Sequence, residues 1–163
     1  MAEAPPRSRF LGFDYHEGSV EDARKAAAPA GFGRRVTFEV SAAQTIPAQG
    51  YDLVCFFDCL HDMADPVGAL RHVRSTMVPD GTCVLVEPFA GDRLEDNLIP
   101  VGRLYYAAST MICTPASLDQ EVGLALGAQA GEARLGKVAE EAGFTRFHRA
   151  IETPFNLILE ARP

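Results

Sequence analysis

The sequence predicts an α/β fold: a doubly wound, mostly parallel sheet that ends in an antiparallel hairpin. Short apolar runs typical of strands alternate with amphipathic helical segments, which indicates a parallel sheet packed against helices. The last two strand-like runs are joined by a short connection, which favours antiparallel pairing. Of the 163 residues, 47% are hydrophobic and 23% are charged, which is enough apolar material for the core of one domain.

The first strand and helix are expected near the N-terminus. Residues 9–15 (RFLGFDY) form a short apolar run that ends in an acid and predict a buried strand. A helix is expected after Ser19, because serine at the N-cap with Asp22 three residues later resembles a capping box. Pro29 and Gly31 are expected to end this helix.

Two more strands are predicted in the next part of the chain. Residues 36–40 (VTFEV) are β-branched and aromatic, and so favour a strand. A loop containing Pro47 and Gly50 leads to residues 51–57 (YDLVCFF), which are apolar on both faces, as expected inside a parallel sheet.

A helix, a turn and a fourth strand follow. Apolar residues at helical spacing predict a helix over 67–77, and the segment Pro79-Asp80-Gly81 predicts a turn. Residues 82–88 (TCVLVEP) predict a strand that is apolar until Glu87. Residues 89–130, rich in Tyr, Leu and Ala, are expected to be irregular or helical.

The C-terminal part predicts one more helix and the closing hairpin. Apolar residues on one side of 132–142 indicate an amphipathic helix, which Gly143 caps. Residues 145–150 and 155–161 are the two final strands.

Charge and composition argue against several classes of function. The chain carries 15 basic and 22 acidic residues, a formal charge of −7, and no basic cluster beyond Arg34-Arg35, so no nucleic-acid partner is expected. No membrane partner is expected either, because polar residues and Pro115 interrupt the longest uncharged stretch, 104–118. The N-terminus lacks the apolar region of a signal peptide.

The four cysteines show no CxxC spacing and lie mostly in apolar runs, as expected of buried thiols in a reducing, cytoplasmic compartment. The acidic segment HDMAD (61–65) is too short and local to close a metal site, so no metal is expected.

Polar residues gather where the predicted strands end, the edge at which open parallel sheets bind ligands. They are Asp14, Ser41, Asp58 and Glu87, with His61 close behind the third strand. An acid at a strand end before a helix can accept hydrogen bonds from both hydroxyls of a ribose, and Asp14 has that context. A simple turn or capping role for Asp14 is an equal alternative.

Four segments resemble class I S-adenosylmethionine-dependent methyltransferases of the bacterial small-molecule type. They are FLGFDYHEGSVEDARKAA, GYDLVCFFDCLHDMADP, LRHVRSTMVPDGTCVLVEP and ETPFNLILEA, in the order and spacing of that family. The resemblance covers residues 9–163 and implies a Rossmann-like methyltransferase fold. It also implies one catalytic domain over 1–163, with a helical lid at about 89–130.

The resemblance implies binding roles for S-adenosylmethionine. Asp14 would bind the ribose hydroxyls, and Tyr15 would lie against the adenine. The adenine-side wall would be formed by Ser41, Ala42 and Ala43. Phe57 and Asp58 would border the methionine part of the cofactor. Many relatives have Asp where this chain has Ala42, so that contact would come from the backbone or be absent.

The same resemblance places the acceptor site near His61. His61 is the candidate general base, with Asp58 and Asp62 near enough in the sequence to raise its basicity; the alternative is a packing residue beside the cofactor. Glu87 either lines the pocket, caps a helix or pairs with Arg93.

The lid would contribute residues that contact the acceptor, although packing is the alternative for the tyrosines. These residues are Asn97, Arg103, Tyr105 and Tyr106.

One departure from the family pattern separates two hypotheses. The family begins with a strand and a glycine-rich loop, D-x-G-x-G-x-G, that cradles the cofactor, and this sequence has no such loop. In the family's sheet order, 3-2-1-4-5-7-6, the missing strand is the central one. The edges of its two neighbours would then be unpaired and would favour a homo-oligomer.

Methyl transfer from S-adenosylmethionine to a small-molecule acceptor is the first hypothesis. The alternative is a truncated, inactive methyltransferase-like domain that acts as an interaction module. A nicotinamide-dependent oxidoreductase is a third, which the missing G-x-G-x-x-G and the closing hairpin oppose.

Overall fold

The computed structural model describes residues 2–3, 5 and 7–163, apart from the side chain of Arg34. The chain divides into two compact units, Met1–Pro47 and Ala48–Pro163, and each is described by itself. None of the helices in the described part of the chain has the length and apolarity needed to cross a membrane.

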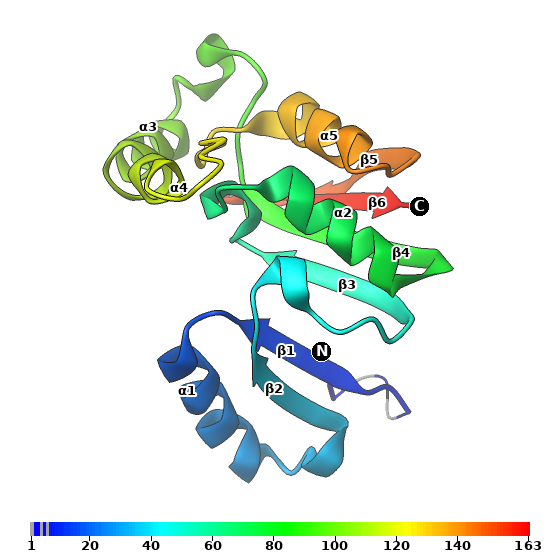
Figure 1. Ribbon diagram of the computed structural model, residues 1–163. Helices are drawn as coiled ribbons and strands as arrows, with labels where there is room; N and C mark the ends of the chain where they lie inside the picture. The colour runs from blue at the N-terminus through cyan, green and yellow to red at the C-terminus, as the bar shows by residue number, and fades with distance from the viewer. Residues whose placement is uncertain (1, 4, 6) are drawn as a thin grey trace. The chain divides into compact units, whose positions relative to one another are not determined.

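The first unit is a β-α-β arrangement. Strand β1 (Phe10–Asp14) and strand β2 (Val36–Val40) pair in parallel, in register from Phe10 opposite Val36 to Asp14 opposite Val40. Helix α1 (Glu17–Ala27) connects them and packs against both strands, and its Val20 is buried (Figure 1). Both strands agree with the predicted ones to within two residues.

The cap of helix α1 differs from the prediction. The N-cap residue is His16 rather than Ser19, and the Nδ1 atom of His16 accepts a hydrogen bond from the backbone N–H of Ser19. The helix therefore begins at Glu17, before the serine that was expected to cap it. At the other end, Ala28–Ala30 form a 3₁₀ turn, and Gly31 adopts the left-handed conformation (φ 73°) that its position after a helix favours.

The second unit is built on a four-stranded sheet with the order β3-β4-β6-β5. Strands β3 (Tyr51–Phe57) and β4 (Met77–Pro88) are parallel and joined through helix α2 (Pro66–Thr76). The closing hairpin of β5 (Arg146–Glu152) and β6 (Asn156–Arg162) is antiparallel, as predicted.

Strand β4 begins earlier than expected. The predicted turn at Pro79-Asp80-Gly81 lies within it, because Tyr51 pairs with Met77 and Leu53 pairs with Thr82. Four residues of β4 thus oppose one residue of β3. The turn residues form an irregularity inside the strand rather than its boundary.

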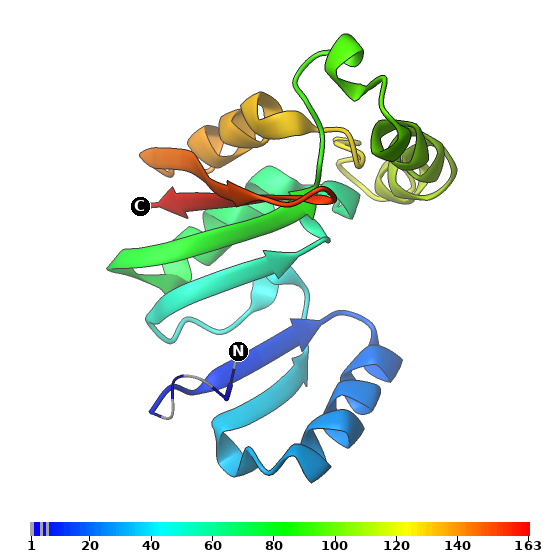
Figure 2. The same ribbon diagram turned by 180° about the vertical axis from the view of Figure 1, so that it is seen from behind.

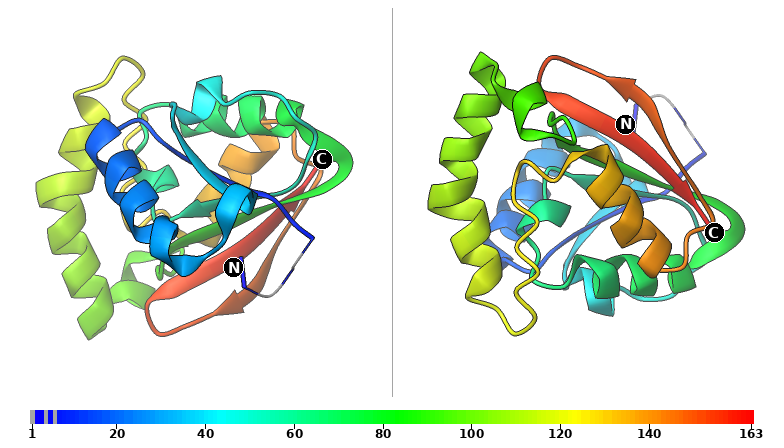
Figure 3. Two further views of the ribbon diagram at one scale, coloured as in Figure 1. Left: turned by 90° about the horizontal axis from the view of Figure 1, so that it is seen from below. Right: turned by 90° about the horizontal axis from the view of Figure 1, so that it is seen from above.

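Helices α2 and α5 (Gly131–Glu141) pack side by side against one face of this sheet (Figures 1–3). Buried and half-buried residues alternate along β6, and Leu157, Leu159 and Ala161 are fully buried. This alternation follows from the pleat, which directs every second side chain to the same face. Leu70 of α2 and Leu135 of α5 are likewise buried.

The insert after β4 is mostly helical. A 3₁₀ turn (Leu94–Asn97) precedes helix α3 (Pro100–Ala108), which continues through a π-helical turn (Ser109–Cys113) into helix α4 (Thr114–Leu118). The mixed helical and irregular character expected for 89–130 is confirmed, and the π-helical turn is an addition.

The observed pairing confirms the predicted sheet order with its central strand absent. Within the described residues, β1 pairs only with β2, and β3 pairs only with β4. Two apolar side chains of β3, which share one face of the strand, are exposed: Leu53 (46%) and Phe57 (58%). The expectation that β3 is buried on both faces is therefore wrong for these two residues.

Candidate active site

The centre of the second unit's candidate site is a buried pair, His61 and Glu87. The Nδ1 atom of His61 lies 2.6 Å from Oε2 of Glu87, and the two residues are 4% and 1% exposed. The other carboxylate oxygen of Glu87 accepts a hydrogen bond from the backbone N–H of Leu60 (3.0 Å). Both oxygens of this buried carboxylate are thereby satisfied.

The parallel strands bring this pair together. Glu87 lies near the carboxyl end of β4, and His61 lies in a 3₁₀ turn (Leu60–Asp62) directly after β3. The chain leaves β3 through Asp58, which has a positive φ of 54° and donates its N–H to Val86 (2.7 Å). Such a conformation is uncommon outside glycine and is a feature of functional sites.

The fully buried side chain of Leu60 anchors the turn, and helix α2 begins directly after it. Asp65 is the N-cap of that helix, and its Oδ1 atom accepts from the N–H of Gly68 (2.7 Å). Pro66 occupies the first helical position, where its missing N–H costs nothing. The sequence LHDMADP therefore builds the turn and starts the next helix.

The carboxylate of Glu87 is the main group that raises the pKa of His61. Burial by itself lowers the pKa of His61, but the hydrogen bond and charge of Glu87, with the charges of Asp62 and Asp58, outweigh it and raise the pKa. A carboxylate at Nδ1 holds the proton on that nitrogen and leaves Nε2 as the proton acceptor. The arrangement is that of an oriented general base.

Two further side chains surround Nε2 of His61. Oδ1 of Asp62 lies 3.3 Å away, without the geometry of a hydrogen bond. Cys113 approaches from the π-helical turn, so that one ligand atom of each of the three residues lies within 4.8 Å of the others. Burial and the carboxylate of Asp62 raise the pKa of the Cys113 thiol to about 11.

All four cysteines have free thiols. Burial raises the pKa of Cys55, and burial together with the charge of Glu87 raises the pKa of Cys59 to about 12. Burial also raises the pKa of Cys83, so these three thiols stay protonated at neutral pH.

Backbone hydrogen bonds hold the insert against the turn that carries His61. Gly127 donates its N–H to the carbonyl of His61 (3.3 Å), and Leu124 donates to Ala64 (2.9 Å). The hydroxyl of Ser117 donates to the carbonyl of Met63 (3.0 Å). The insert is thus held at several points against the turn that carries His61.

Comparison with known families identifies the fold. A family described as methyltransferase domain matches residues 1–143. The chain belongs to this methyltransferase-domain family. No curated protein matches the sequence closely enough to count as a relative.

Three solved structures share the fold of this methyltransferase domain. They are an O-methyltransferase family protein from Burkholderia thailandensis (18% identity, TM-score 0.73), human N-acetylserotonin methyltransferase in complex with SAM (20%, 0.72) and the S-adenosylmethionine-dependent methyltransferase SibL (26%, 0.68). Each match covers 99% of this chain but only 46%, 42% and 46% of the other chain, respectively. The chain thus spans less than half the length of these structures.

The first unit of the methyltransferase domain carries five of the residues predicted to bind cofactor. Asp14 and Ser41 meet at the ends of β1 and β2, where the N–H of Ser41 donates to the carbonyl of Asp14 (2.9 Å). Oδ1 of Asp14 accepts from the N–H of His16 (2.8 Å), and Tyr15 is 81% exposed. Ala42 and Ala43 begin a 3₁₀ turn closed by a hydrogen bond from Thr45 to the carbonyl of Ala42.

The predicted lid residues have different roles. Asn97 is buried, and its amide makes three hydrogen bonds, to the N–H and carbonyl of Gly91 and to the carbonyl of Arg93. These bonds close the 91–97 turn and give Asn97 a structural role, while its contact with the acceptor stays a prediction. Glu87 does not pair with Arg93, which pairs instead with Asp96.

The tyrosines of α3 also differ from one another. The hydroxyl of Tyr105 donates to the carbonyl of Phe155 (2.8 Å), which ties α3 to the hairpin turn. Burial and the charge of Asp58 raise the pKa of Tyr105. Tyr106 and Arg103 are exposed on the helix, so an acceptor contact for them stays a prediction.

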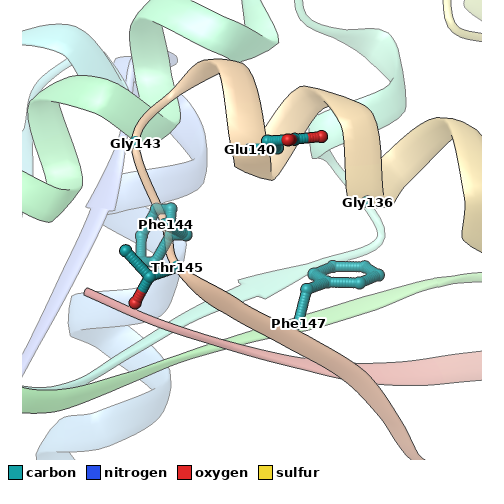
Figure 4. Close-up of a pocket in the computed structure, with 6 residues that line it drawn as sticks. All are labelled: Gly136, Glu140, Gly143, Phe144, Thr145 and Phe147. Atoms are coloured by element: carbon teal, nitrogen blue, oxygen red, sulfur yellow. The ribbon is translucent and has the colours of Figure 1, made fainter.

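Two concave surfaces lie outside the His61–Glu87 pair. One lies between α5 and β5 and is lined by Glu140 of the helix and by Phe144, Thr145 and Phe147 (Figure 4). The second, of about 750 Å³, is mostly apolar and includes Phe89, Leu104 and Phe155. Neither is lined by His61 or Glu87.

What sequence reasoning missed here is Cys113. No metal-ligand spacing places it near the HDMAD segment, because the two are brought together by the π-helical turn and the hydrogen bonds of the insert. A cysteine within a helical run would be expected to pack, and sequence alone carries no signal for its contact with His61.

Proposed function

We propose that the domain transfers a methyl group from S-adenosylmethionine to a small-molecule acceptor, with His61 as the general base. The contact between Glu87 and His61 carries this proposal. A buried carboxylate that orients imidazole serves acceptors that must lose a proton, a hydroxyl group above all. The family membership of residues 1–143 supports the reaction class.

His61, Glu87 and the insert have separate roles in the proposed reaction. When bound, S-adenosylmethionine would supply an electrophilic methyl group on a sulfonium, and the sulfur would leave as a neutral thioether when the acceptor oxygen takes the methyl. Nε2 of His61 takes the proton of the acceptor hydroxyl, and Glu87 stabilises the imidazolium that results. The insert, held on the His61 turn by Gly127, limits the access of water.

The first unit fits the cofactor's adenosine. Asp14 presents an exposed carboxylate at the carboxyl end of a parallel strand, a position suited to the two hydroxyls of a ribose. The exposed ring of Tyr15 next to it offers a stacking surface for adenine. Ser41, Ala42 and Ala43 follow the neighbouring strand at the same edge. Phe57 and Asp58, at the end of β3, are proposed to border the methionine part.

Calorimetric titration with S-adenosylmethionine and S-adenosylhomocysteine tests the cofactor proposal. Replacing Asp14 by Asn removes a charged acceptor, worth about 1.5–3 kcal/mol, and should weaken binding roughly 10- to 100-fold. Asp22→Asn is the matched control, because Asp22 is an exposed acid of the same unit that pairs with Lys25. The absence of binding by the unaltered chain would contradict the proposal.

The strand edges favour a second candidate function, association with another copy. β1 and β3 each pair with one strand among those described, and an exposed apolar edge is a template for another chain. We propose pairing of two copies through β3, and Leu53→Lys at this edge should prevent it. Light scattering should then show an oligomer for the unaltered chain and a monomer for the variant. A monomer at every concentration of the unaltered chain would contradict this pairing.

A further inference from the structure

Three side chains with different donor atoms converge beside the candidate base. A ring nitrogen of His61, a carboxylate oxygen of Asp62 and Sγ of Cys113 lie within 4.8 Å of one another. They come from two separate segments, the 3₁₀ turn after β3 and the π-helical turn of the insert. His61 and Cys113 are buried, while Asp62 is half-buried.

The surroundings of His61 are those of a metal ligand. A ligating histidine commonly donates its second ring N–H to a carboxylate, which fixes the tautomer and directs the other nitrogen at the ion. Glu87 makes this contact at Nδ1, at 2.6 Å. The nitrogen that remains, Nε2, is the one that lies 3.3 Å from Oδ1 of Asp62, and it is the one free to bind an ion.

Asp62 provides a second, independent observation. Its Oδ1 atom is buried and makes no hydrogen bond of regular geometry among the described residues. It faces Nε2 of His61 at 3.3 Å, a contact that becomes an ion pair only when His61 is protonated, so with neutral His61 this oxygen has no donor. Leaving a buried carboxylate oxygen without a partner is costly, and a cation at this point would remove the cost. The unsatisfied oxygen therefore points to a ligand between Asp62, His61 and Cys113.

The donor set selects the kind of ion. Imidazole nitrogen, carboxylate oxygen and thiolate sulfur together suit zinc, whereas magnesium and calcium prefer oxygen ligands throughout. Ligand atoms of a tetrahedral zinc site lie about 3.3–3.8 Å apart, from metal–ligand distances of about 2.0–2.3 Å. A contraction of about 1 Å would bring the cluster to that spacing, and half-buried Asp62 has room to adjust.

We propose that His61, Asp62 and Cys113 form a binding site for Zn²⁺ or a similar borderline divalent cation, with a fourth position left for water. Cys113 binds as thiolate, and its proton passes to solvent when the ion binds. The site does not depend on methyl transfer. The ion would occupy the lone pair of Nε2 that the proposed base uses, so the metal-bound and base-active states exclude each other.

Titration with Co²⁺ after treatment with a chelator and a reductant tests the site. Tetrahedral Co²⁺ reports its own geometry through visible absorption, and a thiolate ligand adds a charge-transfer band in the near ultraviolet. The expected result is one equivalent bound, with this band, and release of Co²⁺ by added Zn²⁺. Absence of the band in the unaltered chain would overturn the proposal.

Substitutions of single residues test which side chains bind the ion. Cys113→Ser should abolish the charge-transfer band and weaken Co²⁺ binding by about tenfold or more, whereas Cys55→Ser, at a half-buried thiol of β3, should keep both. Asp62→Asn should retain the band but bind more weakly, which tests the site even if Cys113→Ser does not fold by circular dichroism. A band that is the same in Cys113→Ser, or unchanged affinity in Asp62→Asn, would overturn the assignment.

Discussion

Oε2 of Glu87 lies 2.6 Å from Nδ1 of His61, and the two residues are 1% and 4% exposed, respectively. The same carboxylate accepts a hydrogen bond from the backbone N–H of Leu60, so Glu87 fixes both the imidazole ring of His61 and the turn that carries His61. One buried acid at the end of β4 therefore has a structural and a chemical role, and the two can be separated by substitution.

Truncating Glu87 should destabilise the fold. Glu87→Ala leaves Nδ1 of His61 and the N–H of Leu60 buried without their acceptor, at a cost of about 2–5 kcal/mol. Urea unfolding followed by circular dichroism measures the change, with Glu95→Ala at an exposed position of the insert as the control. A loss below about 0.5 kcal/mol for Glu87→Ala would show that the pair does not hold the turn.

Asn97 should matter for the stability of the fold. Asn97→Ala removes three hydrogen bonds of a buried amide that closes the 91–97 turn, so we expect a loss of about 1–3 kcal/mol. Arg103→Ala, at an exposed position on α3, should change stability little. Equal stability of the two variants in thermal unfolding would argue against the structural role of Asn97.

Gly102 should tolerate no side chain. A Cβ atom at this position of α3 would clash with the backbone carbonyl of Asn97, which cannot move as a flexible side chain could. We expect Gly102→Ala to cost about 1–3 kcal/mol despite the better helix propensity of alanine. Gly136→Ala in α5 meets only the ring of Phe147, at 3.2 Å, and should change stability by less than about 1 kcal/mol. If the two variants have the same midpoint of thermal unfolding, the close approach of α3 to the 91–97 turn is wrong.

Local sequence patterns were sufficient to predict the bounds of most of the strands. Val36–Val40 and Tyr51–Phe57 have the predicted bounds, because β-branched and aromatic runs end at turn residues on both sides. The start of β4 was missed, because Pro79 and Gly81 favour a turn by themselves, while pairing with β3 extends the strand past them. The cap of α1 was missed because a histidine side chain took the place of the expected serine.

The candidate site was predicted less completely, because it depends on contacts between distant segments. His61 and Glu87 each lie at the end of a strand, and sequence placed both at the same edge of the sheet. Their contact was not among the alternatives for Glu87, which were to line the pocket, to cap a helix or to pair with Arg93, because only tertiary structure brings the two side chains together. The approach of Cys113 depends on the path of the whole insert, which has no periodic signature of its own.

The central claim is that His61 accepts the proton of the methyl acceptor, while Glu87 keeps the imidazole ring of His61 in the required orientation. Methyl transfer from labelled S-adenosylmethionine to a panel of phenols, with chelator present, measures it directly. For a phenol that the unaltered chain methylates, His61→Asn should lower kcat by about 10²- to 10⁴-fold and leave the KM for S-adenosylmethionine nearly unchanged. His148→Asn, at an exposed histidine of β5, should leave both unchanged. A kcat for His61→Asn within about threefold of the unaltered chain would contradict the account.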